Sequence, residues 1–143
     1  MADKLSLEVV TPFRTVLNED VDSVTLPGIE GEMGILPEHV PLLTTLDAGI
    51  MSYVNGDGKT QAIAVHWGYA QVDGNNVRVL AELAETAHEI DLPRAQEAEK
   101  NAKELLQSEK PTSSDWEDEE SRQKIYENKL RRSVVRQALA KFQ

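Results

Sequence analysis

Residues 77–98 read VRVLAELAETAHEIDLPRAQEA, and the spacing of the apolar residues changes within this stretch. Up to Leu83, apolar and polar residues largely alternate, which is typical of a strand with one buried face. After Asp91, apolar residues recur at three- and four-residue intervals, as on one face of a helix. Asp91 is a favourable N-cap residue, and Pro93 falls in the first turn, where its missing N–H costs nothing. We therefore predict a β-structured domain, residues 1–84, followed by a helical part, residues 85–143.

The β-structured domain contains several further stretches with strand character. Leu5, Leu7 and Val9 alternate with polar neighbours, and residues 21–26 show a similar pattern. Other apolar runs lie at residues 49–54, 62–65, 69–72 and 77–80, and the turn sequences Pro27-Gly28, Asn55-Gly56-Asp57-Gly58 and Asp73-Gly74-Asn75-Asn76 separate the predicted strands. Short strands without a long helix between them favour an antiparallel β-sandwich or a flattened barrel.

Two helices are expected in residues 85–143, and they offer each other little apolar surface. The first carries a stripe of mostly small residues, which allows close approach but contributes little burial. The second has an apolar stripe at spacing four, with Lys129, Arg132 and Arg136 turned roughly opposite to it. The apolar positions are Leu92, Ala95, Ala98, Ala102, Leu105 and Leu106, then Tyr126, Leu130, Val134, Val135, Ala138, Leu139 and Phe142. Such a two-helix antiparallel hairpin is hardly stable alone, so we expect it to dock on the sandwich, on a partner, or on each in turn.

The composition permits a real core and excludes several classes of partner. Apolar residues make up 40% of the chain, and the formal net charge is −10. The first 84 residues hold twelve acidic and four basic residues, which disfavours nucleic-acid binding. No run approaches the roughly 18 apolar residues of a membrane span, and the first four residues lack the apolar stretch of a signal peptide. We therefore expect no direct membrane insertion. Without cysteine there is neither a disulfide nor a thiolate ligand.

No group of residues has the spacing of a catalytic or metal site. The sequence lacks a Walker-type phosphate loop, a Gly-x-Ser-x-Gly elbow and paired metal-binding histidines. His39 stands between two prolines and is expected to be a structural loop residue, whereas His66 lies in a predicted strand and is expected to pack. We predict no catalytic residue, no metal site and no required cofactor.

The segment GIEGEMG, residues 28–34, has three evenly spaced glycines and superficially resembles a phosphate-binding loop. Such a loop needs converging N–H groups and a positive field, and Glu30 and Glu32 oppose this. The segment is better interpreted as a tight strand connection whose glycines adopt positive φ. Whether its carboxylates also face a polar or basic partner is left open by the sequence.

Four segments carry a resemblance to a known family. They are LSLEVVTP at 5–12; LPGIEGEMGILP at 26–37 with His39 and Pro41-Leu42-Leu43; Val79-Leu80-Ala81 with Ala84-Glu85; and IDLPRA at 90–95. In this order they resemble the epsilon subunits of bacterial F-type, proton-translocating ATP synthases. The segment at 26–37 is the most specific of the four.

The resemblance implies a β-sandwich followed by a helical hairpin, in agreement with the periodicity. It also implies a non-catalytic subunit of the central stalk, peripheral on the cytoplasmic face of the bacterial plasma membrane. There it would contact the gamma subunit and the membrane ring of c subunits, and would turn with the rotor that couples proton flow to ATP synthesis. In this family the C-terminal helices can leave the sandwich, extend toward the catalytic beta subunits and inhibit ATP hydrolysis, as expected of a weakly cohesive hairpin.

The resemblance also assigns roles to individual residues. A loop with Glu30, Gly31, Glu32, Met33 and His39 is expected to contact the rotor ring. The basic face of Lys129, Arg132 and Arg136 would engage acidic groups of the beta subunits; alternatively it is a solvated face paired with Asp115 and Glu117–Glu120.

A regulatory ATP site on the folded hairpin is the last implied feature. Some family members sense ATP through the pattern found here at residues 90–95, and the matching residues are Glu85, Asp91, Arg94, Arg132 and Arg136. The three arginines are suited to phosphate, although Asp91 is equally explained as an N-cap.

Two segments depart from the family pattern. Trp67 stands where one of two adjacent glycines is common, and residues 107–121 form a longer and more acidic connection between the helices. The alternative function considered is a free-standing β-sandwich adaptor that binds a peptide or protein, and the segment at residues 27–41 argues against it.

Overall fold

The structure, a computed structural model, describes residues 4–108 and 116–141. Seven strands precede two helices, with a single 3-10 turn, η1 (Ala87–Glu89), between the two parts. The strands are β1 (Leu5–Val10), β2 (Thr15–Gly28), β3 (Gly31–Ile35), β4 (Leu42–Leu46), β5 (Gly49–Asn55), β6 (Thr60–Asp73) and β7 (Asn76–Thr86); the helices are α1 (Leu92–Ser108) and α2 (Trp116–Ala140). The predicted β-sandwich followed by a two-helix hairpin is confirmed.

Five strands close into a flattened barrel in the order β1–β7–β6–β5–β2, with β2 pairing again with β1. β4 continues the pairing along β6, and β3 extends the sheet beyond β2. All pairs are antiparallel except β1–β7, which is parallel. One departure from the predicted antiparallel arrangement is unavoidable, because a closed ring with an odd number of strands cannot have every neighbouring pair antiparallel.

The core follows the alternation seen in the sequence. Leu5, Leu7 and Val9 of β1 are fully buried, and their inward side chains meet those of the other strands in one cluster. Burying a side chain of this size contributes about 1.5–3 kcal/mol, so this cluster holds the barrel closed. The remaining buried members are Val21, Val24, Leu26, Ile35, Leu46, Met51, Tyr53, Ile63, Val65, Ala70, Val72, Val77, Val79, Ala81 and Ala84.

The segment expected to be a loop at residues 28–34 is instead mostly strand. β2 runs to Gly28, and β3 begins at Gly31 after a two-residue turn. Among the three glycines only Gly31 has positive φ, at 131°, so the expectation for Gly28 and Gly34 was wrong. The β2–β3 hairpin could not be predicted from apolar alternation, because β3 is an edge strand. It pairs only with β2 over its full length and leaves most of its side chains exposed.

The helices form the predicted hairpin, and Asp91 caps the first of them. Oδ1 of Asp91 accepts a hydrogen bond from the backbone N–H of Arg94 at 3.2 Å. Few helical side chains are buried in the described part of the hairpin, namely Ala95, Ala102, Ser133 and Leu139. The predicted stripe of α2 is wrong at Val134 and Ala138, which are exposed, and Phe142 lies outside the described residues. The buried face instead passes through Ser133. The hydroxyl of Ser133 donates a hydrogen bond to the carbonyl oxygen of Leu130 at 2.7 Å.

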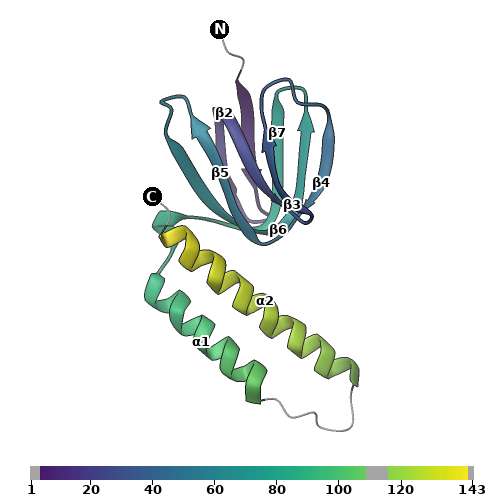
Figure 1. The fold of residues 1–143 in the computed structure, drawn as a ribbon, viewed down its shortest axis with the longest axis vertical. Coiled ribbons are helices and arrows are strands. Elements are labelled where there is room, and N and C mark those ends of the chain that lie inside the picture. Colours follow the sequence, from purple (N-terminus) through teal and green to yellow (C-terminus); the bar gives the residue numbers. More distant parts are fainter. Residues whose placement is uncertain (1–3, 109–115, 142–143) are drawn as a thin grey trace.

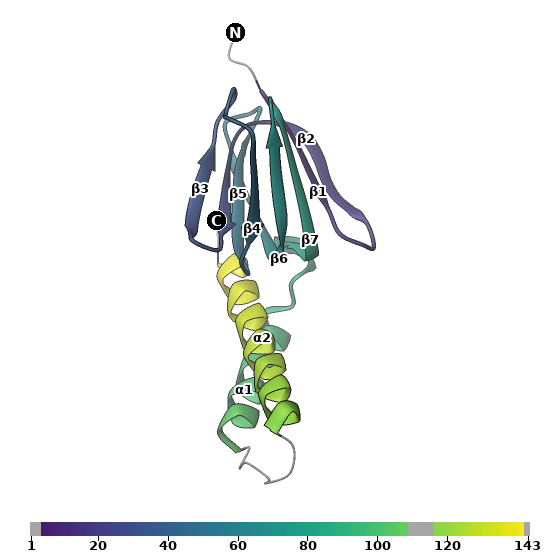
Figure 2. The ribbon, with the colours of Figure 1, turned by 90° about the vertical axis from the view of Figure 1, so that its right-hand side faces the viewer.

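The hairpin extends away from one end of the sandwich. Figures 1 and 2 both show the C-terminal turns of α2 beneath this end, with α1 alongside α2 and farther from the strands. Most contacts between α2 and the strands are made with β5 and β6, and Arg136 of α2 also bonds to Glu85 of β7. We call α1 and α2 together the arm.

Candidate functional site

The β2–β3 turn presents the acidic residues predicted to meet the rotor ring. Glu30 and Glu32 are exposed, and Met33 is half-buried. His39 lies beyond the far end of β3, and five strand residues span roughly 13 Å, so the structure does not bring His39 to this turn. Its Nδ1 lies 2.7 Å from the carbonyl oxygen of Val40, as suits a structural loop residue.

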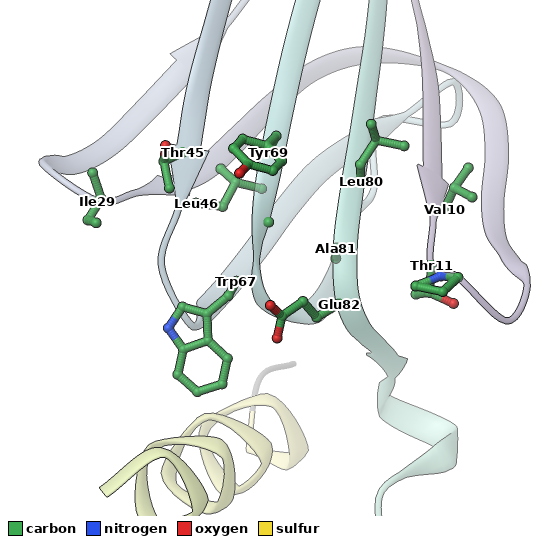
Figure 3. Close-up of a pocket in the computed structure, with 12 residues that line it drawn as sticks. Val10, Thr11, Ile29, Thr45, Leu46, Trp67, Tyr69, Leu80, Ala81 and Glu82 are labelled. Carbon is green, nitrogen blue, oxygen red and sulfur yellow. The ribbon is translucent and has the colours of Figure 1, made fainter. Parts of the chain in front are cut away.

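An apolar groove of about 560 Å³ lies across the outer face of β4, β6 and β7, and we call it the outer groove. Figure 3 shows its lining side chains, with Ile29 projecting from the β2–β3 turn, Tyr69 from β6 and Leu80 from β7. These three are 62%, 57% and 45% exposed, respectively, although each is large and apolar or aromatic. Contiguous exposed apolar surface is typical of a site where another protein binds. The full lining is Val10, Thr11, Pro12, Ile29, Thr45, Leu46, Trp67, Gly68, Tyr69, Leu80, Ala81 and Glu82.

Trp67 and Gly68 form an irregular step at the lower end of this groove. Gly68 has φ 139°, and a Cβ there would lie 2.0 Å from the carbonyl oxygen of Leu80, so only glycine fits. Trp67 has φ 55°, a left-handed conformation that costs a residue with a Cβ roughly 1–2 kcal/mol. The register of the flanking pairs, Leu46 with Gly68 and Gly49 with Val65, places Asp47 opposite Trp67.

A second cavity, of about 300 Å³, lies where the sandwich meets the arm, and we call it the junction cavity. It brings together four of the five residues expected to sense ATP, namely Glu85, Asp91, Arg94 and Arg136. Arg132, one turn earlier in α2, is not among the lining residues. The other lining residues are Glu89, Ile90, Ala95 and Ala98.

Glu85 is the polar centre of this junction. Its Oε1 accepts from Nε of Arg136 at 2.7 Å, and Nε2 of the buried His66 lies 3.2 Å from the same oxygen. Burial alone would raise the pKa of Glu85, but the hydrogen bonds of His66 and Arg136 outweigh it and hold that pKa below its ordinary value. Nδ1 of His66 is buried without a hydrogen-bond partner among the described residues. The expectation that His66 packs is confirmed, and its bond to Glu85 is an addition.

The three basic residues predicted to share a solvated face do not have equivalent surroundings. Lys129 is exposed, with Nζ 5.9 Å from the ring centre of Tyr126, whereas Arg136 is half-buried against Glu85. The side chains of the acidic cluster offered as their resting partners, Asp115 and Glu117–Glu120, lie outside the described residues.

A second arginine of α2 that contacts the sandwich is Arg131, which the sequence did not single out. Its Nη2 donates to Oδ1 of Asp47 at 2.7 Å, and its guanidinium carbon lies 5.9 Å from the ring centre of Trp67. Burial would raise the pKa of Asp47, but hydrogen bonds from Arg131 and from the backbone of Ala48 lower it. The departure from the family glycine at Trp67 was the one signal in the sequence that pointed here.

Comparison with known proteins supplies the identity of this arrangement. The family described as "ATP synthase, Delta/Epsilon chain, beta-sandwich domain" matches residues 4–87. The ATP synthase epsilon chain of Geotalea uraniireducens is 44% identical over 140 residues, which cover 98% of this chain and 96% of that one. This chain belongs to the ATP synthase epsilon family. The epsilon chain of Carboxydothermus hydrogenoformans is 57% identical over 106 residues, 74% of this chain and 78% of its own.

The likeness extends to solved structures, where it shows the fold. A chain of the Euglena gracilis mitochondrial ATP synthase superposes with a TM-score of 0.79 at 24% identity, covering 94% of this chain and 80% of that one. A chain of the Tetrahymena thermophila mitochondrial ATP synthase gives a TM-score of 0.57 at 14% identity, covering 94% and 98%. Sandwich and arm therefore recur together.

Membership of the epsilon family confirms the resemblance stated from the sequence, and with it the role of an epsilon subunit of ATP synthase. Within residues 4–108 and 116–141, no helix is long and apolar enough to cross a membrane. The described side chains include no group of three His, Cys, Asp or Glu residues able to hold a metal ion.

Proposed function

We propose that this chain is the non-catalytic rotor subunit of a bacterial proton-translocating ATP synthase. It sits in the central stalk on the cytoplasmic face of the plasma membrane and couples rotation of the membrane ring to ATP synthesis. The observation that carries the proposal is the outer groove, because a sandwich that leaves Ile29, Tyr69 and Leu80 exposed on one face needs a partner there.

The partner of the outer groove is the gamma subunit. The groove is apolar at its centre, and Glu82 lies at its lower end beside Trp67 (Figure 3). An apolar centre with polar groups at the margin is the common arrangement of protein interfaces. Leu80→Asp and, separately, Tyr69→Asp are expected to abolish binding to purified gamma subunit, while Glu97→Gln on the exposed face of α1 leaves it unchanged. Full binding by both aspartate variants would refute this placement.

The membrane ring of c subunits is the partner of the β2–β3 turn. Glu30 and Glu32 are exposed there and suit a polar or basic loop, where rim charges tune association more than affinity. Because the chain has no cysteine, Glu32→Cys introduces the only thiol. A cross-link from this thiol to a ring subunit is expected; cross-links confined to non-rotating subunits would contradict the assignment.

The arm acts as a regulatory element that engages the catalytic beta subunits when it is extended. The small buried area between the helices and the polar contacts with the sandwich support a release of this kind. The test compares ATP hydrolysis by the assembled complex with the full chain and with a chain ending after Ile90. A stop near Leu83 would remove Ala84, which is buried in the sandwich core. Faster hydrolysis with the shortened chain is expected, and an equal rate would remove the inhibitory role.

We further propose that the junction cavity binds ATP as a regulator, through its phosphates. Arg94 and Arg136 supply two guanidinium groups, and the volume is at the lower end of ligand pockets, which suits phosphate better than a whole nucleotide. Phosphate would compete with Glu85 for Arg136. Titration of ATP into the isolated chain, followed by amide chemical shifts, is expected to give saturable shifts near Asp91 and Arg94 that Arg94→Ala abolishes and Arg132→Ala does not. Absence of saturation at several millimolar would exclude the site.

A further inference from the structure

Three residues from distant parts of the chain meet at the end of the sandwich that faces the arm. Asp47 stands in the bend between β4 and β5, Trp67 lies opposite it in β6, and Arg131 comes from α2. Arg131 donates to Asp47 at 2.7 Å and lies over the indole ring of Trp67. Figure 3 shows the indole pointing out of the groove toward α2 rather than into the sandwich.

Trp67 has a backbone conformation that is unusual for a residue with a large side chain. A left-handed φ of 55° suits glycine, yet the largest side chain occupies the position. The indole is no part of the buried core of the sandwich, so core packing does not explain it. Strain of this kind persists where the side chain makes contacts elsewhere. The indole lies near His66, lines the outer groove, lies beneath Arg131 and donates a hydrogen bond to the carboxylate of Asp47.

Arg131 suits these surroundings because guanidinium combines both interactions. Its cationic group lies over an aromatic ring while its edge donates to a carboxylate, a combination that lysine reproduces poorly. Asp47 also accepts from the N–H of Ala48 at 2.9 Å, which fixes the carboxylate toward the helix. Both partners of the arginine are therefore held in place by the sandwich itself.

We propose that Asp47 and Trp67 form a clamp that holds Arg131 and thereby sets how readily α2 leaves the sandwich. Few apolar side chains of the described arm are buried, so the clamp and the Arg136–Glu85 pair are the polar contacts that hold it to the sandwich. The existence of the clamp is a property of the isolated chain; only its effect on ATP hydrolysis rests on the proposed function of the arm.

The test measures docking in the full-length chain by amide hydrogen exchange of residues 126–139. Arg131→Ala and Asp47→Asn are each expected to speed exchange roughly three- to tenfold, the scale of an exposed ion pair together with a cation–π contact. The double variant is expected to exchange no faster than the faster single variant, because both changes remove the same interaction. Lys124→Ala, on an exposed position of the same helix, is the matched control and should leave exchange unchanged. Unchanged exchange in Arg131→Ala, or effects that simply multiply in the double variant, would overturn the clamp.

Trp67→Gly separates a clamp from a structural role of the indole. Glycine relieves the left-handed backbone, so exchange in β5 and β6 should stay equal or become slower while exchange in α2 rises. Faster exchange in β5 and β6 as well would mean that Trp67 supports the sandwich and would overturn the proposal. In a Trp116→Phe background Trp67 is the sole tryptophan, and Arg131→Ala should then make its fluorescence more accessible to acrylamide.

A last comparison keeps the clamp and the proposed function distinct. If Arg131→Ala loosens the arm of the isolated chain but leaves ATP hydrolysis of the assembled complex unchanged, the clamp stands and the inhibitory arm fails. If exchange is unchanged in the isolated chain, the clamp fails whatever the assembled complex does.

Discussion

Replacing Glu85 by glutamine removes one charge from the junction cavity and leaves the volume of the side chain almost unchanged. In the folded chain Glu85 accepts from Arg136 and from His66. Glutamine keeps an oxygen that can still accept from one of them. The variant therefore tests the charge of the contact rather than its shape.

The size of the effect follows from the exposure of the pair. The side chains of Glu85 and Arg136 are 18% and 30% exposed, so water screens their interaction only in part. A hydrogen bond to a charged group contributes about 1.5–3 kcal/mol and a neutral one about 0.5–1.5 kcal/mol. We therefore expect Glu85→Gln to weaken docking of the arm by about 1–2 kcal/mol, a factor of about 5–30 in the population of released arm.

The same carboxylate makes docking dependent on pH. Because the folded pKa of Glu85 lies below its ordinary value of 4.5, its contribution is fully present above that value and is lost as pH falls through the lowered pKa. Asp47 has its pKa lowered in the same sense. Docking is thus expected to weaken as pH falls through the lowered pKa values of these carboxylates, and less so in Glu85→Gln than in the natural chain.

The assay is hydrogen exchange of α2 in the isolated chain at neutral pH, repeated as pH is lowered after correction for intrinsic exchange. Arg136→Met supplies the second arm of a double-mutant cycle, since it keeps a long side chain without the charge. Equal exchange in Glu85→Gln and the natural chain at neutral pH would refute the reasoning. So would a difference between them that fails to shrink in acid.

Other predictions concern the stability of the sandwich and of α1. Gly68→Ala is expected to abolish folding, or to lower the free energy of unfolding in urea by more than about 4 kcal/mol, because its Cβ would overlap the backbone of β7. Gly34→Ala, with open space around the added Cβ, should lower it by less than about 1 kcal/mol. Asp91→Ala should lower the stability of α1 by about 1 kcal/mol through the lost N-cap, and Asp91→Asn should restore it; equal helix melting in both would exclude a capping role. Arg14→Ala breaks a two-point contact with Glu89 at 2.6 and 2.7 Å, but the pair is exposed, so thermal unfolding should shift little.

Much of the fold could be predicted because apolar and polar residues alternate along the strands, and the apolar ones mark the buried face. Leu5, Leu7 and Val9 are fully buried as predicted. β3 was missed because an edge strand that buries little carries no alternation, and its glycines imitate a loop. The two apolar runs at residues 62–65 and 69–72 proved to be a single strand, β6, because a left-handed tryptophan followed by glycine bends the strand without ending it.

Only those residues of the junction cavity that match the family pattern could be predicted from the sequence. Glu85, Asp91, Arg94 and Arg136 lie together in the junction cavity as that pattern implies. Arg132 does not join them, because it lies one helical turn earlier on α2. The ion pair between Asp47 and Arg131 joins residues 84 positions apart, and no local spacing rule can find such a contact.

The distribution of contacts explains how a sandwich and an arm can be stable together and still separate. Between the two helices the buried residues are mostly small, so their packing is close but contributes little. Between α2 and the sandwich, Arg131 and Arg136 each meet a carboxylate whose position is fixed by other bonds of the sandwich. Contacts of this kind are directional and individually small, so few of them need to break before α2 leaves. When it does leave, the carboxylates return to water, and the apolar surface of the sandwich that loses its cover includes the indole of Trp67 beneath Arg131. The core of the sandwich stays closed because its buried cluster includes no residue of the arm. The boundary between the two parts is therefore a place where the fold can open without unfolding.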